Sequence, residues 1–267
     1  MKTKNMPRWE KFMCSWWFFL ILVLSTGLLI PVATNNFSFE AIGEIITHTL
    51  GNAWINRISF LSPVFQILAL VFFALILFGK GRFDKWFTTY AGSSYLFFAV
   101  IQNVSITETY GVSIVTSNVV LMGLVAFVWL RDLSRGHNRY SFKRLNGKNA
   151  WLVAVSVFCF WWPLNPVTIQ PDFNPVYLFT STSAMAFCPM TPIFLAVLIL
   201  SEPGIDPLCY RVTAMAGTII GLLNMGSFAN PFTFWLGVYH LPLLVVSIYA
   251  LIRSSRFCKQ TGTENYV

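Results

Sequence analysis

Long apolar segments alternate along the chain with short stretches that hold nearly all of its charged residues. A helix needs about 20 apolar residues to cross the hydrocarbon core of a bilayer, and seven stretches of that size lack Asp, Glu, Lys and Arg. The longest, 212–252, contains Gly226 and Asn230-Pro231 near its middle, and these turn residues divide it into two spans. The pattern therefore predicts about eight transmembrane helices, over residues 12–33, 58–79, 88–106, 111–130, 149–166, 176–200, 208–226 and 231–252.

The composition agrees with this pattern. Of the 267 residues, 56% are hydrophobic and only 10% are charged, whereas a soluble domain has about 25% charged residues. The mean hydropathy is +0.64. We therefore predict an all-α integral membrane protein, with a single polytopic transmembrane domain over 1–252 and a short basic tail over 253–267.

The basic residues predict the orientation of these helices. With eight spans, 17 of the 18 Lys and Arg residues fall on one side of the membrane, and only Arg57 falls on the other. Loops rich in Lys and Arg remain in the cytoplasm, so both termini are expected there, in a multi-pass protein of the cell membrane. Topology thus accounts for the net charge of +8, and no nucleic-acid partner is expected.

Residues 38–57 predict an external amphipathic helix that lies on the membrane surface. Its apolar face carries residues at helical spacing, namely Ile42, Ile45, Ile46 and Leu50. Its polar face carries a row at i, i+4 and i+8, namely Glu40, Glu44 and His48. Two carboxylates and an imidazole suit a divalent cation, which makes this row a metal-site candidate. A solvated polar face is the alternative, because one helical row rarely completes a coordination shell.

The predicted spans contain no Lys, Arg, Asp or Glu near their centres. Intramembrane charges are typical of proton relays and charge-coupled pumps, so a carboxylate-driven antiporter and a retinal protein with a Schiff-base lysine are disfavoured. No motif of an intramembrane protease or a nucleotide-binding loop is present, and the sequence specifies no cofactor. The five cysteines all lie outside the predicted external loops, so no structural disulfide is expected.

Two spans contain proline near their midpoints. Cys188-Pro189-Met190-Thr191-Pro192 lies in the span 176–200, and His240-Leu241-Pro242 lies in the span 231–252. Proline removes a helical hydrogen bond, and two interrupted helices at one depth are typical of a transporter binding site. The alternative is that these prolines only bend helices around a packed core. Separately, Thr213, Gly217 and Gly221 form a small-residue face on which two helices can approach closely.

These observations predict a small transporter or permease for a small solute, with a midplane site near broken helices six and eight. The candidate substrate-binding residues are Cys188, Met190, Thr191, His240, Gln102, Asn103, Asn118, Ser181 and Ser183. Two other functions fit the same sequence. One is a non-catalytic membrane subunit that anchors a larger complex, and the other is an intramembrane lipid-modifying enzyme using His240 or Cys188. The expected partners are the lipid bilayer and either other membrane subunits or further copies of the chain.

Overall fold

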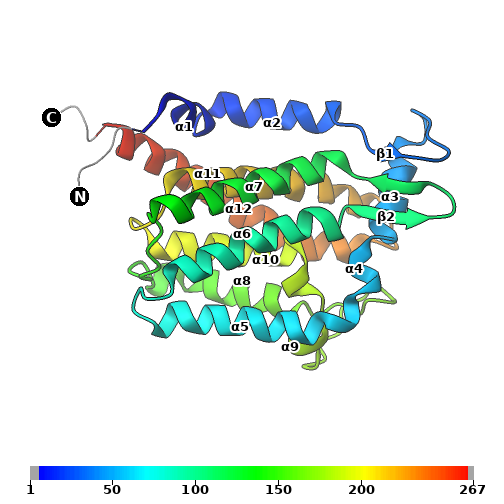
Figure 1. Ribbon diagram of the computed structural model, residues 1–267. Coiled ribbons are helices and arrows are strands. Elements are labelled where there is room, and N and C mark those ends of the chain that lie inside the picture. The colour runs from blue at the N-terminus through cyan, green and yellow to red at the C-terminus, as the bar shows by residue number, and fades with distance from the viewer. Residues whose placement is uncertain (1–5, 264–267) are drawn as a thin grey trace.

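The computed structural model describes residues 6–263, and the side chains of residues 6–258. The chain folds into a mostly helical bundle in which the helices run side by side (Figure 1). The first and last helices meet at one end of the bundle, and a small β-sheet covers the opposite end. This arrangement confirms the helical class that the apolar pattern predicts.

Four helical segments are long and apolar enough to cross a membrane. They are Ser59–Phe78, which contains α5 (Ser62–Phe78), α7 (Thr116–Arg135), Pro207–Ala229, which contains α11 (Pro207–Asn224), and Phe234–Cys258 in α12 (Phe234–Thr263). A fifth is a bent pair described below. The other helices in predicted spans are α2 (Trp16–Leu28), α6 (Asp84–Ile101) and α8 (Ala150–Trp161). The described residues thus contain four spans by length and composition, or five with the bent pair.

The centre of the bundle is α10 (Phe187–Ser201), in which every residue except Cys188 is buried. It packs against α8, α11 and α12, while α6 and α7 form an adjoining antiparallel pair. Aromatic rings fill the space between these pairs, with Phe194 of α10 against Tyr95 of α6 and Trp129 of α7. Trp129 also donates a 2.9 Å hydrogen bond from Nε1 to Thr213 of α11, so its polar edge is satisfied inside an apolar core.

The predicted small-residue face of α11 packs against α12. A Cβ atom placed on Gly217 would lie 2.3 Å from Oγ of Ser247, and one on Gly221 would lie 3.1 Å from Cα of Leu244. Glycine is therefore needed at both positions for α11 and α12 to approach this closely, as expected for small residues at membrane helix contacts.

The sequence pattern did not predict the β-sheet. Its strands are β1 (Val32–Ala33), β2 (Val104–Thr107) and β3 (Gly111–Ile114), which pair antiparallel in the order β1-β3-β2. These residues lie at the ends of the predicted spans 12–33, 88–106 and 111–130, so those helices are shorter than expected. Four-residue strands rich in Val and Ile look like the end of an apolar span. Gly111, with φ of +61°, makes the turn between β2 and β3.

The predicted helix over 38–57 is present as α3 (Ile42–Gly51) and the short α4 (Trp54–Arg57). Its buried face differs from the predicted stripe. Ile45 and Thr49 are buried, while Leu50 is exposed, because α3 packs on the sheet, where Thr49 donates a 2.8 Å hydrogen bond to Ser113 of β3.

The helix break near Pro189 and Pro192 was predicted at the wrong place. The span divides earlier, into α9 (Tyr177–Thr180) with a 3-10 turn (Ser183–Met185) and then α10, and the two parts meet at 87°. Pro189 is tolerated because it lies in the first turn of α10. Backbone N–H groups in the first turn make no hydrogen bond within the helix, so the absence of one at proline removes none. α10 and α12 both continue as helices through Pro192 and Pro242.

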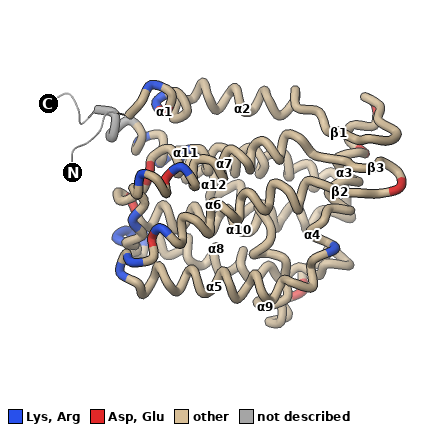
Figure 2. Tube along the Cα trace, in the orientation of Figure 1, with Lys and Arg blue, Asp and Glu red and all other residues tan. Residues whose placement is uncertain are grey.

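Charged residues gather at the end of the bundle that carries both terminal helices (Figure 2). The short α4, which ends at Arg57, lies at the opposite end of the bundle, near the sheet (Figure 1). The first helices, α1 (Arg8–Met13) and α2, lie on the outside, and Leu22 is the only buried residue of α2. The part of the predicted basic tail that the structure describes, residues 253–263, continues α12.

Candidate functional site

The structure places the predicted polar residues around the break before α10. Oε1 of Gln102, just after α6, accepts a 2.8 Å hydrogen bond from the backbone N–H of Phe187, the first residue of α10. A helix N-terminus leaves its first N–H groups without helical partners. Gln102 therefore caps α10 from the end of a neighbouring helix.

Ser181 and Ser183 form a second polar group at the break, together with Gln66, which was not among the predicted site residues. Nε2 of Gln66, on α5, lies 2.7 Å from the hydroxyls of both serines, and Ser183 donates to the carbonyl of Phe160 at the end of α8. Gln66 is completely buried, and its Oε1 has no hydrogen-bond partner among the described residues. These contacts join α5, α8 and the bent segment.

A cavity of about 290 Å³ lies beside the break. It is lined by Ala184 from the 3-10 turn, and by residues of α5 and α6 that include Phe65, Tyr90 and Ser94. The hydroxyl of Tyr90 is buried without a hydrogen-bond partner in the described part of the chain. An unpaired buried hydroxyl costs about 1–3 kcal/mol. The oxygen is enclosed, so a molecule in the cavity would reach it only after neighbouring side chains move.

Other predicted residues have separate partners. Nδ1 of His240 lies 2.7 Å from the carbonyl of Leu236 on its own helix, and its ring meets Trp162. Sγ of Cys188 instead lies 3.9 Å from Nδ2 of Asn224. The two side chains that were predicted to share a site thus make different contacts.

The remaining candidates are distributed over the bundle. Met190 and Thr191 are buried on α10, and Thr191 accepts a 3.3 Å hydrogen bond from Tyr95. Asn103 is buried and donates to the last carbonyls of α6. Asn118 is half-buried in the first turn of α7.

The row proposed for a metal at 40–48 lies at the sheet end. Glu40 precedes α3, so it does not continue the helical row of Glu44 and His48, and the His48 ring packs against Tyr110. Among the described residues, the one group of three metal-ligating side chains with donor atoms within 4.8 Å of one another lies elsewhere.

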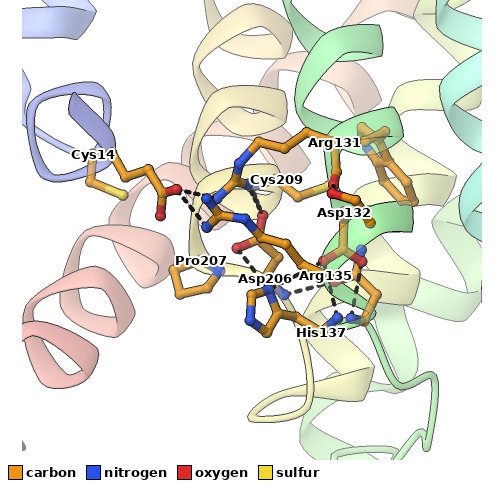
Figure 3. Close-up of polar contacts among 12 residues, drawn as sticks. Cys14, Arg131, Asp132, Arg135, His137, Asp206, Pro207 and Cys209 are labelled. Atoms are coloured by element: carbon orange, nitrogen blue, oxygen red, sulfur yellow. Dashed lines mark hydrogen bonds and ion pairs between the residues drawn. The ribbon is translucent and has the colours of Figure 1, made fainter. Parts of the chain in front are cut away.

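That group belongs to a buried ionic cluster at the charged end, drawn in Figure 3. Asp132, in the last turn of α7, accepts hydrogen bonds from the N–H groups of His137 and Asn138. Gly136, with φ of +64°, ends α7 in the left-handed conformation and turns the chain back toward Asp132. Asp206 caps α11 by accepting a 3.2 Å hydrogen bond from Cys209.

Arginines connect these carboxylates to the N-terminal helix. Arg131 of α7 lies 2.8 Å from Asp206 and 2.7 Å from Glu10 of α1, and Arg135 also pairs with Glu10 (Figure 3). Both Glu10 and Asp206 are no more than 3% exposed. A buried carboxylate is stable only when it is paired and hydrogen-bonded, so the cluster joins α1, α7 and α11 as one unit.

His137 is the accessible member of the cluster. Its side chain is 46% exposed, and Nδ1 lies 3.4 Å from Asp132 and 3.9 Å from Asp206. The hydrogen bond with Asp132 raises the pKa of His137 above its usual value. Burial likewise raises the pKa of Asp206. The site therefore holds proton-binding groups that also have the chemistry of metal ligands.

Two further charged contacts flank this cluster. Glu202, before α11, forms two hydrogen bonds with Arg253 of α12, at 3.1 and 2.6 Å, and it also pairs with Arg144. Arg211 of α11 is fully buried and lies over the ring of Trp16 at 4.4 Å. Near it, the Sγ atoms of Cys14 and Cys258 are 2.6 Å apart.

Comparison with known proteins adds no relative: no family model, no curated protein and no solved structure matches the chain.

Proposed function

We propose that the protein is a membrane permease for a small uncharged polar solute, and that the solute binds beside the break before α10. The bent helix that borders the cavity of about 290 Å³ carries this proposal. In membrane transporters, substrate sites form where helices are discontinuous, because non-helical backbone is tolerated only where it is buried in protein or lines a cavity.

The polar groups near the cavity support the class of solute. The hydroxyl of Tyr90 is unpaired, and the carbonyl oxygen of Gln66 is unpaired nearby at the break. Neither carries a charge, and the cavity walls are otherwise mostly aromatic and aliphatic. A small molecule with hydroxyl or amide groups would satisfy these enclosed atoms if side chains at the cavity wall move to admit it, whereas an ion would lose its hydration without a compensating charge.

The proposal includes the orientation in the bilayer. Helices lie within each of the eight predicted spans, although four of them, or five with the bent pair, are long and apolar enough to cross a membrane. The end that carries the basic residues in Figure 2 would face the cytoplasm. Reporter fusions at residues 140 and 262 should then report a cytoplasmic location, and one at 170 an external location.

Osmotic reswelling of proteoliposomes tests transport with a panel of uncharged solutes of increasing size. Vesicles with the purified protein are mixed rapidly with urea, glycerol or larger polyols, and light scattering follows solute entry. We expect faster entry of at least one small solute than in protein-free vesicles.

Tyr90→Phe should slow that entry, because it removes only the hydroxyl, whereas the matched variant Tyr249→Phe, at the charged end, should not. Entry rates equal to those of protein-free vesicles for the whole panel would refute the proposal.

A further inference from the structure

Three side chains with metal-ligating atoms lie close together at the charged end of the bundle. These atoms are Oδ1 of Asp132, Nδ1 of His137 and Oδ1 of Asp206, drawn from the end of α7, the following loop and the start of α11. Asp132 and Asp206 are nearly completely buried, while the imidazole reaches solvent. In Figure 3 the His137 ring lies between the two carboxylates.

The separations of these atoms match a known coordination geometry. Zn²⁺ binds His nitrogen and carboxylate oxygen at about 2.0–2.2 Å in a tetrahedron, and two such ligand atoms are therefore about 3.4 Å apart. The structure places Nδ1 of His137 3.4 Å from Asp132 and 3.9 Å from Asp206. All three donor atoms lie within 4.8 Å of one another, so movements of about 1 Å by these side chains would bring them to the tetrahedral separation.

The net charge of the cluster is a second, independent observation that favours a bound cation. Three buried carboxylates, those of Glu10, Asp132 and Asp206, meet two guanidinium groups, those of Arg131 and Arg135. With a neutral imidazole this leaves one negative charge uncompensated, and an unpaired buried charge is costly. Lys85 approaches the loop at Gly136, but its side chain is exposed.

We propose that Asp132, His137 and Asp206 bind a divalent transition metal ion of the Zn²⁺ type, with a fourth position open to solvent. Each carboxylate retains lone pairs for the metal beyond those used by its N–H donors. A protonated His137 is the competing way to neutralise the cluster. The two differ in what they require at position 137: a metal needs a ligand atom, and ion pairing needs a positive charge.

Metal titration of the full-length purified protein in detergent, after chelator treatment, tests the site. Co²⁺ reports tetrahedral coordination by its visible absorption, and calorimetry measures the affinity for Zn²⁺. We expect stoichiometric binding, and a loss of more than about 100-fold in affinity for His137→Ala, which exceeds the 10- to 100-fold loss typical of residues one shell further out. Because His137 is half-exposed, this variant is expected to fold.

Two controls separate the alternatives. His137→Cys supplies a metal ligand without the imidazolium charge, so it should recover most of the affinity. His48→Ala removes the histidine of the other candidate row and should bind as the wild type does. Equal weak binding by the wild type and His137→Ala, failure of His137→Cys to recover affinity, or a loss confined to His48→Ala would each overturn the proposal. None of these results depends on solute transport.

Discussion

The contact between α11 and α12 allows the cost of one added methyl group to be predicted. A Cβ on Gly217 would lie 2.3 Å from Oγ of Ser247, 3.1 Å from its Cβ and 3.2 Å from Cγ2 of Thr191. Ordinary contacts between carbon atoms are about 3.5–4.0 Å, so Gly217→Ala forces either α12 as a whole or the side chain of Ser247 to move. Overpacking of this kind costs about 1–3 kcal/mol.

Alanine also has a higher helix propensity than glycine, by about 1 kcal/mol, which partly offsets that cost. The matched variant Gly123→Ala isolates the two effects, because a Cβ on Gly123, in α7, meets no atom within 4 Å. We expect Gly123→Ala to be neutral or slightly stabilising and Gly217→Ala to lower the free energy of unfolding by up to about 2 kcal/mol. The difference between the two variants is then the packing cost, about 1–3 kcal/mol.

Unfolding of the purified variants in detergent micelles, followed by circular dichroism against increasing denaturant, measures this difference. Ser247→Gly removes both of the closest atoms, so it should restore most of the lost stability in the Gly217→Ala background. Equal stability of Gly217→Ala and Gly123→Ala, or no recovery with Ser247→Gly, would refute the reasoning from helix distance.

Three further perturbations test other contacts. Glu202→Gln should cost about 3 kcal/mol of unfolding free energy, because it leaves the guanidinium of Arg253 without its buried carboxylate; the exposed Glu108→Gln should change stability little, and equal losses would contradict the difference in burial. Gln102→Leu removes the acceptor for the first N–H of α10 and should lower stability by about 1–2 kcal/mol, measured by the same unfolding assay. Burial raises the pKa of Asp84, so the wild type should lose stability as the pH rises through that pKa, whereas Asp84→Asn should not; melting temperatures from pH 4 to 8 that fall in parallel for both proteins would contradict this.

The positions of the helices could be predicted because a buried or lipid-facing helix needs a continuous apolar run. Their ends could not, because a short strand such as β2, with Val104 and Ile106, has the same apolar composition as the end of a span. The bend before α10 was also misplaced. Proline suggested a break at Pro189, yet the chain bends at Ser181–Ala186, where Gln66 and Gln102 supply hydrogen bonds from other helices. Such tertiary partners leave no local pattern in the sequence.

The ionic cluster could have been suspected from one feature of the sequence. Six carboxylates occur within or beside the basic segments. Glu264 lies outside the described residues, and the structure buries the other five: Glu10, Asp84, Asp132, Glu202 and Asp206. An acidic residue at the end of an apolar span, among many basic ones, indicates a specific ion pair. The partners could not be assigned, because Asp206 and Arg131 are 75 residues apart and only the fold brings them together.

The attachment of the N-terminal helices also constrains the order in which the protein can assemble. Leu22 is the one buried residue of α2, so contacts near the start of this helix add to a small apolar interface: Glu10 with Arg131, Trp16 with Arg211, and Cys14 near Cys258. The last pair is separated by 244 residues, which take about 12–50 s to synthesise at 5–20 residues per second. The contacts of α1 and α2 with α7 can form once Arg131 has been synthesised, but a chain that stalls before Arg211 leaves Trp16 without its guanidinium partner.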